Sequence, residues 1–172
     1  MNDDFFKYLD QLELLGFFSG YPLLYAFITS LFVHKKIGIE KIRIVSLLPL
    51  AYAFTGTLYL GLQLKNVYPD FSFSNIQATI QPLKLVAFIS VLFWFPLLSK
   101  RPVISLLHSL IFFFFLAKDL FVHTVKNQPG DGRMQNNMKV FTDSLLLNII
   151  SLITVVLFTY FILFIKRRSK KI

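Results

Sequence analysis

The sequence predicts an all-α integral membrane protein, a polytopic bundle of about five transmembrane helices. The 172 residues are 55% hydrophobic and include 21 Phe, a composition too apolar for an ordinary soluble domain of this length. Five apolar stretches reach the roughly 17–25 residues that a helix needs to cross about 30 Å of hydrocarbon. These predicted spans are residues 15–33, 42–62, 82–98, 103–122 and 144–165.

Charge predicts the orientation of these spans. With the N-terminus outside, the inner connections and the C-terminal end hold 11 of the 18 basic residues but only one of the nine acids. The inner side then carries +10 and the outer side −1, which is the positive-inside pattern. We therefore expect an outside N-terminus and a cytoplasmic C-terminus. The Ile-, Lys- and Phe-rich usage favours a bacterial cytoplasmic (inner) membrane.

The first two elements differ in polarity. Residues 1–14 are acidic and amphipathic, which predicts a short helix lying on the outer interface. The first span, 15–33, contains Gly16, Gly20 and Pro22, so we expect it to be kinked. The second span, 42–62, is followed by a polar outer loop with the turn signal Tyr68-Pro69-Asp70.

Three further spans complete the predicted bundle, joined by one tight turn and one long loop. Spans 82–98 and 103–122 are joined by a tight inner turn, and an interrupted hairpin that never fully crosses is the alternative. Residues 124–142 form the most hydrophilic loop, and span 144–165 ends in the basic tail 166–172. Residues 15–165 would therefore form one transmembrane domain, with no soluble part large enough to be a domain of its own.

Polar residues within the spans form three stripes at helical spacing. On the fourth span, His108 and Asp119 project within about 20° of each other, close to two serines and His123. The stripe of the second span is Tyr52, Thr55, Gly56, Tyr59 and Gln63, and that of the fifth is Asp143, Ser144, Asn148, Ser151 and Thr154. We expect these helices to face one another or a partner subunit.

Two interpretations of the stripes remain open, since polar groups at membrane depth are costly. In one, a polar pathway or binding cavity passes between the helices, with Lys84, Lys118 and Asp143 at its outer mouth. Its lining would be His108, Asp119, Asn148, Ser151, Tyr59 and Gln63. In the other, the hydroxyls and Asn148 hydrogen-bond across helices and serve packing alone.

Other chemistries find little support in the chain. It has no Cys, which excludes disulfides, thiolate zinc sites and iron–sulfur clusters. Asp119 with His123 would be too few ligands for a metal. His34 with His108 could ligate a haem, but the chain has only three His and no CxxCH, and His34 lies at a loop edge, so we expect no metal and no cofactor. Catalytic motifs are absent. The basic residues suit topology and anionic lipid rather than nucleic acid.

Three functions follow, in decreasing order of support. The first is a small accessory or structural subunit that packs its helices against a larger membrane complex or another copy of itself. The second is a small oligomeric transporter or channel for an ion, a proton or a small polar solute. The third is a membrane enzyme acting on a lipid-linked substrate, with Lys84, Lys118 and Lys126 holding a phosphate near Asp119 or Asp143.

Overall fold

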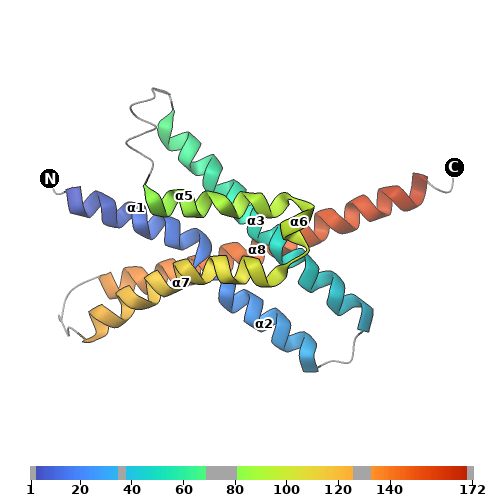
Figure 1. The fold of residues 1–172 in the computed structure, drawn as a ribbon, viewed down its shortest axis with the longest axis horizontal. Coiled ribbons are helices and arrows are strands. Elements are labelled where there is room, and N and C mark those ends of the chain that lie inside the picture. Colours follow the sequence, from blue (N-terminus) through green and yellow to red (C-terminus); the bar gives the residue numbers. More distant parts are fainter. Residues whose placement is uncertain (1–2, 35–37, 69–80, 126–132, 170–172) are drawn as a thin grey trace.

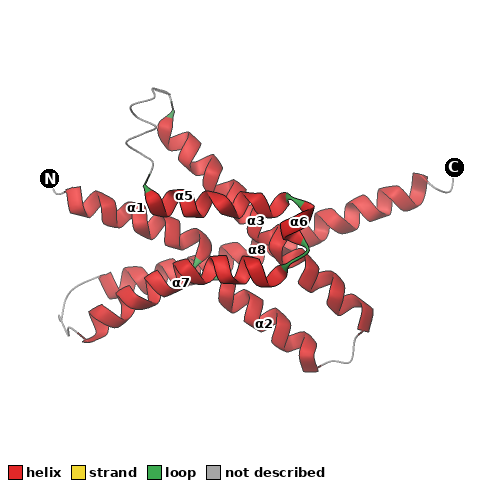
Figure 2. Ribbon diagram, in the orientation of Figure 1, coloured by secondary structure: helices red, strands yellow, loops and turns green. Residues whose placement is uncertain are grey.

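All elements in the described part of the chain are helices (Figures 1 and 2). The computed structural model describes residues 3–34, 38–68, 81–125 and 133–169. In chain order the elements are α1 (Asp3–Phe18), α2 (Tyr21–His34), α3 (Gly38–Val67), α5 (Pro82–Phe88), the 3-10 helix η1 (Ile89–Trp94), α6 (Pro96–Ser99), α7 (Pro102–Val125) and α8 (Arg133–Ser169).

The protein is a multi-pass membrane protein with a helix-bundle architecture. Four helical stretches in the described residues are long and apolar enough to cross a bilayer. They are Tyr8–Leu31, Ile44–Val67, Pro102–Val122 and Gln135–Ser169. The predicted spans 103–122 and 144–165 lie within the last two of these, and the predicted span 42–62 overlaps the second from residue 44 onward. The first stretch covers parts of both α1 and α2.

The predicted span 82–98 differs, because it is short and broken. Its apolar helical part, Pro82–Trp94, combines 7 α-helical with 6 3-10 residues, a length of about 23 Å. Phe95 then adopts an extended conformation before α6 begins at Pro96. The segment nevertheless returns the chain along the bundle, from the end where α3 finishes to the end where α7 begins (Figure 1).

A close helix contact accompanies this break. Ser90 of η1 lies against Gly56 of α3, where any added Cβ would overlap the Ser90 side chain. The Ser90 hydroxyl donates to the carbonyl oxygen of Ala87 at 2.5 Å. A glycine on one membrane helix allows a neighbouring backbone to approach closely. Hydropathy alone does not reveal this approach.

The kink expected in the first span lies at Ser19 and Gly20, between α1 and α2. Residues 3–14, which belong to the segment expected on the outer interface, form most of α1. This helix is packed into the bundle, with Leu12, Leu14, Leu15 and Phe18 buried. Its acidic residues Asp10 and Glu13 find polar partners on α5 and α3, which makes this packing possible.

Aromatic side chains fill the centre of the bundle. Phe18 stacks on Phe112 of α7 with 4.9 Å between ring centroids and meets Tyr52 of α3 edge-on at 5.7 Å. Tyr52 also meets Phe93 of η1 edge-on at 5.6 Å. Because α1, α3, α7 and η1 all contribute, this core fixes the positions of the polar groups around it. Away from the core, α2 and the C-terminal half of α8 diverge from the other helices (Figure 1).

Candidate functional site

The polar stripe of α8 caps the break between α1 and α2. The side-chain amide of Asn148 donates to the carbonyl oxygen of Phe17 at 2.9 Å, and the backbone N–H of Gly20 donates to the Ser144 hydroxyl at 2.8 Å. A broken helix leaves backbone groups without partners, and lipid offers none. Ser144 and Asn148 therefore replace hydrogen bonds that the break removes.

The same stripe also contacts α3. The Thr55 hydroxyl donates to the Ser151 hydroxyl at 3.0 Å and lies 3.4 Å from Asn148 Oδ1. Thr55, Asn148 and Ser151 are all almost fully buried. The stripes predicted on the second and fifth spans thus face each other. Only part of the fifth stripe is buried, because Asp143 and Thr154 are exposed.

His108 of α7 joins α3 to α5. Its Nδ1 lies 2.7 Å from the Tyr52 hydroxyl, and its Nε2 lies 2.9 Å from the carbonyl oxygen of Val86. A carbonyl oxygen only accepts, so Nε2 carries a proton, and Nδ1 of a neutral ring then accepts from Tyr52. One turn away, the Tyr21 and Ser105 hydroxyls are 2.8 Å apart. Both ring nitrogens of His108 are therefore engaged between helices.

A second polar cluster lies at the end of the bundle where α1 begins. Lys84 of α5 pairs with Asp10 at 3.0 Å, and Gln63 Nε2 of α3 donates to Glu13 at 2.6 Å. Lys84, near the start of α5, is only 5% exposed, which is unusual for a charged side chain. Sequence reasoning found Lys84, Gln63 and Tyr59 but missed Asp10 and Glu13. The available signal was their spacing: residues three apart lie on the same face of a helix, and Glu13 directly precedes Leu14, which is buried.

The remaining predicted charged residues are Asp119 of the lining and Lys118 and Asp143 of the mouth. Asp119 of α7 accepts from Gln11 Nε2 at 3.2 Å, whereas Lys118 and Asp143 are exposed. The side chains of His34 and His123, and the whole of Lys126, lie outside the described residues. Within the described residues, no three His, Asp or Glu side chains come together as a metal site would require.

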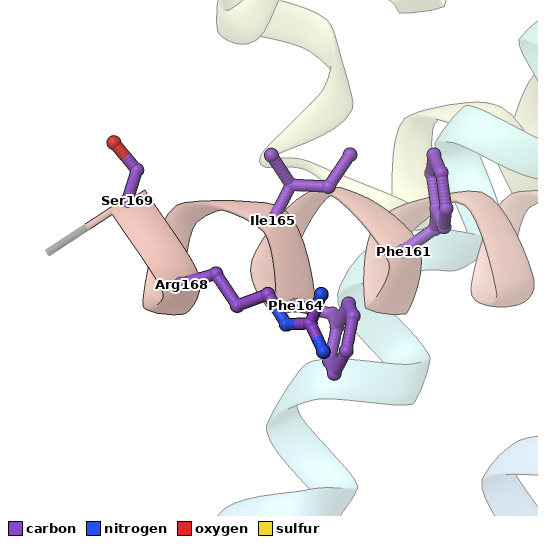
Figure 3. Close-up of a pocket in the computed structure, with 5 residues that line it drawn as sticks. All are labelled: Phe161, Phe164, Ile165, Arg168 and Ser169. Atoms are coloured by element: carbon purple, nitrogen blue, oxygen red, sulfur yellow. The ribbon is translucent and has the colours of Figure 1, made fainter. Parts of the chain in front are cut away.

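Two surface hollows differ in chemistry. A groove of about 300 Å³ lies beside the α1-end cluster and is lined in part by Asp10, Gln81 and Lys84. A hollow of about 500 Å³ lies along the last turns of α8, where Arg168 is 5.2 Å from the centroid of the Phe164 ring (Figure 3). Every residue lining the second hollow comes from α8 alone, so it is the surface of one helix rather than an enclosed site.

Comparison with family models, curated proteins and solved structures gave no match to this chain. Function is therefore argued from the geometry above.

Proposed function

We propose that this chain is a small accessory subunit of a larger membrane complex and acts by packing its helices against a partner's. One observation carries the proposal. Most of the polar side chains that could have lined a pathway are bonded within the bundle, with both His108 nitrogens and the Asn148 side chain engaged. Side chains used in this way stabilise helix contacts and leave few groups to bind a passing solute.

The surface offered to a partner would be the outward apolar faces of α7 and α8. Phe114 of α7 is 64% exposed, as are Leu157 and Phe158 of α8. In the C-terminal half of α8, most apolar side chains are exposed. Such a helix needs either lipid or other helices around it. We propose that transmembrane helices of a larger protein cover part of this surface.

The test is purification of the tagged full-length chain from its native membrane in mild detergent, followed by sizing and mass spectrometry. A larger membrane protein present in fixed stoichiometry is the expected result. A chain that purifies only with itself contradicts the proposal and favours the transporter or enzyme alternatives.

A matched pair of variants locates the contact. Leu157→Ala with Phe158→Ala should reduce the amount of partner recovered by about tenfold, which is the change produced by about 1.4 kcal/mol. Leu146→Ala with Ile150→Ala is the control, because both residues are also exposed, 56% and 51%, but lie in the other half of α8. If the Leu157/Phe158 variant recovers as much partner as the Leu146/Ile150 control, the C-terminal half of α8 does not form the contact.

We also propose that five segments cross a bacterial inner membrane, with the N-terminus outside and the C-terminus in the cytoplasm. The charge asymmetry supports this orientation. The course of α5, η1 and α6 along the bundle supports a fifth crossing (Figure 1). Tilt or local thinning of the bilayer would accommodate its short length at modest cost.

The absence of Cys makes the topology easy to test. Single substitutions Asp143→Cys and Arg101→Cys introduce thiols at two exposed positions, one in the first third of α8 and one directly before α7. A membrane-impermeant maleimide should label the first in intact cells and the second only after lysis. The reverse pattern contradicts the orientation. Labelling of both thiols in intact cells would mean that the segment 82–98 does not cross the membrane.

A further inference from the structure

The junction of α1, α3 and α5 holds a cluster of charged and amide side chains that the proposed function does not use; its Gln63 and Lys84 are buried, whereas Asp10 and Glu13 are half-buried. Glu13 accepts from Gln63 Nε2 at 2.6 Å, and Asp10 pairs with Lys84 Nζ at 3.0 Å. Gln63 and Lys84 are each only 5% exposed. Ionisable groups buried in a membrane protein are costly and commonly mark a functional site.

Two oxygen atoms in this cluster have no hydrogen-bond partner in the described part of the chain. They are Gln63 Oε1 and the Tyr59 hydroxyl, and both atoms are inaccessible to solvent. Tyr59 is fully buried one helical turn before Gln63, and the charges of Glu13 and Asp10 both act on its hydroxyl. Buried polar atoms almost always have partners, so these two point to a missing ligand.

Charge and access indicate what the ligand is. Asp10 and Glu13 carry two negative charges and Lys84 one positive charge, which leaves the cluster at −1. The available atoms are carboxylate, amide and phenol oxygens, which are typical ligands of hard cations. A groove of about 300 Å³ lies beside the cluster and is lined in part by its members Asp10 and Lys84.

We propose that this junction binds one monovalent alkali cation, Na⁺ or K⁺, through the Glu13 carboxylate, Gln63 Oε1 and the Tyr59 hydroxyl. The cation balances the excess negative charge and supplies a partner for both unpaired oxygens. A divalent ion suits the cluster less well, because Lys84 already neutralises one of the two carboxylates. This inference does not depend on the accessory-subunit proposal.

The test compares the melting temperature of the purified full-length chain in NaCl, KCl and choline chloride at equal ionic strength. An ion that binds only the folded state should raise the Tm by roughly 2–5 °C over choline. The sodium and potassium arms identify which ion binds. Equal Tm values in all three salts overturn the proposal and leave a buried water molecule as the partner of the two oxygens.

Variants separate ion binding from folding. Tyr59→Phe removes a hydroxyl that makes no hydrogen bond to any described residue, so the Tm of this variant in choline should equal or exceed that of the native chain. Its gain in alkali salt should fall by at least half, and Glu13→Gln should lose the gain entirely. Asp143→Asn, at an exposed site on α8, should keep it. A full gain in both Tyr59→Phe and Glu13→Gln overturns the proposal.

Discussion

The two halves of α8 have different surroundings, although both are apolar enough to lie in a membrane. In the first half, Ser144, Asn148 and Ser151 are buried against α1 and α3, and Asn148 is 1% exposed. In the second half, from residue 156 onward, all described side chains are half-buried or exposed, and Phe158 is 64% exposed. Within one membrane helix, buried polar residues mark the face that meets protein, and overall hydropathy does not.

The largest loss of stability should come from filling the space at Gly20 against which the first half of α8 packs. Gly20→Ala places a Cβ on the backbone of Ser144 and Leu145, where no flexible side chain can yield. We expect a loss of about 3 kcal/mol of unfolding free energy, at the upper end for overpacking. Unfolding of purified protein in a mixed-micelle SDS titration measures it.

The matched control for that substitution is Gly61→Ala. Gly61 is exposed on α3 and has nothing within 4 Å of an added Cβ, so Ala should stabilise the helix by about 0.5–1 kcal/mol. If both variants lose stability equally, the contact between the α1/α2 break and α8 does not hold the bundle together.

The next effect tests the polar cap itself. Asn148→Leu leaves the carbonyl oxygen of Phe17 buried without its donor, which should cost about 2 kcal/mol in the same titration. Thr154→Val is the control, because the Thr154 hydroxyl bonds only within α8, to Ile150, and is exposed. A loss below 0.5 kcal/mol, roughly the scale of surface changes, would show that the cap is dispensable.

Apolar truncations compare the two halves directly. Leu152 is 7% exposed, and Leu152→Ala should cost about 1.5 kcal/mol, because the cavity remains even where transfer into lipid costs little. Leu157 is 64% exposed, and Leu157→Ala should change stability by less than about 0.5 kcal/mol. A large loss for Leu157→Ala in the isolated chain would mean that this half of α8 is covered by another copy.

The smallest effect concerns His108, the strongest candidate for a pathway residue. The double-mutant cycle of Tyr52→Phe and His108→Phe should give a coupling of about 1 kcal/mol, since the two side chains share one hydrogen bond. A coupling near zero, together with loss of solute flux in His108→Phe, would instead favour the pathway interpretation.

Much of the architecture could be predicted because lipid demands long apolar helices, and three spans lie in helices where hydropathy predicted them. The broken third segment was not predicted. Its course depends on the contact between Gly56 and Ser90, which are 34 positions apart and show no periodic signal. The kink at Gly20 was predictable because its glycine and the nearby proline are local features.

The candidate site was predicted only in part, for the same reason. Helical spacing placed Thr55, Asn148 and Ser151 on faces that do meet. The partners of Lys84 and Gln63 were missed, because Asp10 and Glu13 lie on a segment whose acidity resembles a surface helix. Pairing of charges between distant segments buries that segment, and a single sequence carries no pattern for such pairing.

The cap on the α1/α2 break has a consequence for biogenesis. Phe17 and Gly20 leave the ribosome more than 120 residues before their partners Asn148 and Ser144. The break between α1 and α2 should therefore keep unpaired backbone groups until the part of α8 that holds Ser144 and Asn148 has been synthesised. A chain ending at residue 143 should show rapid hydrogen exchange around Gly20, and slow exchange there would mean that another segment protects the break first.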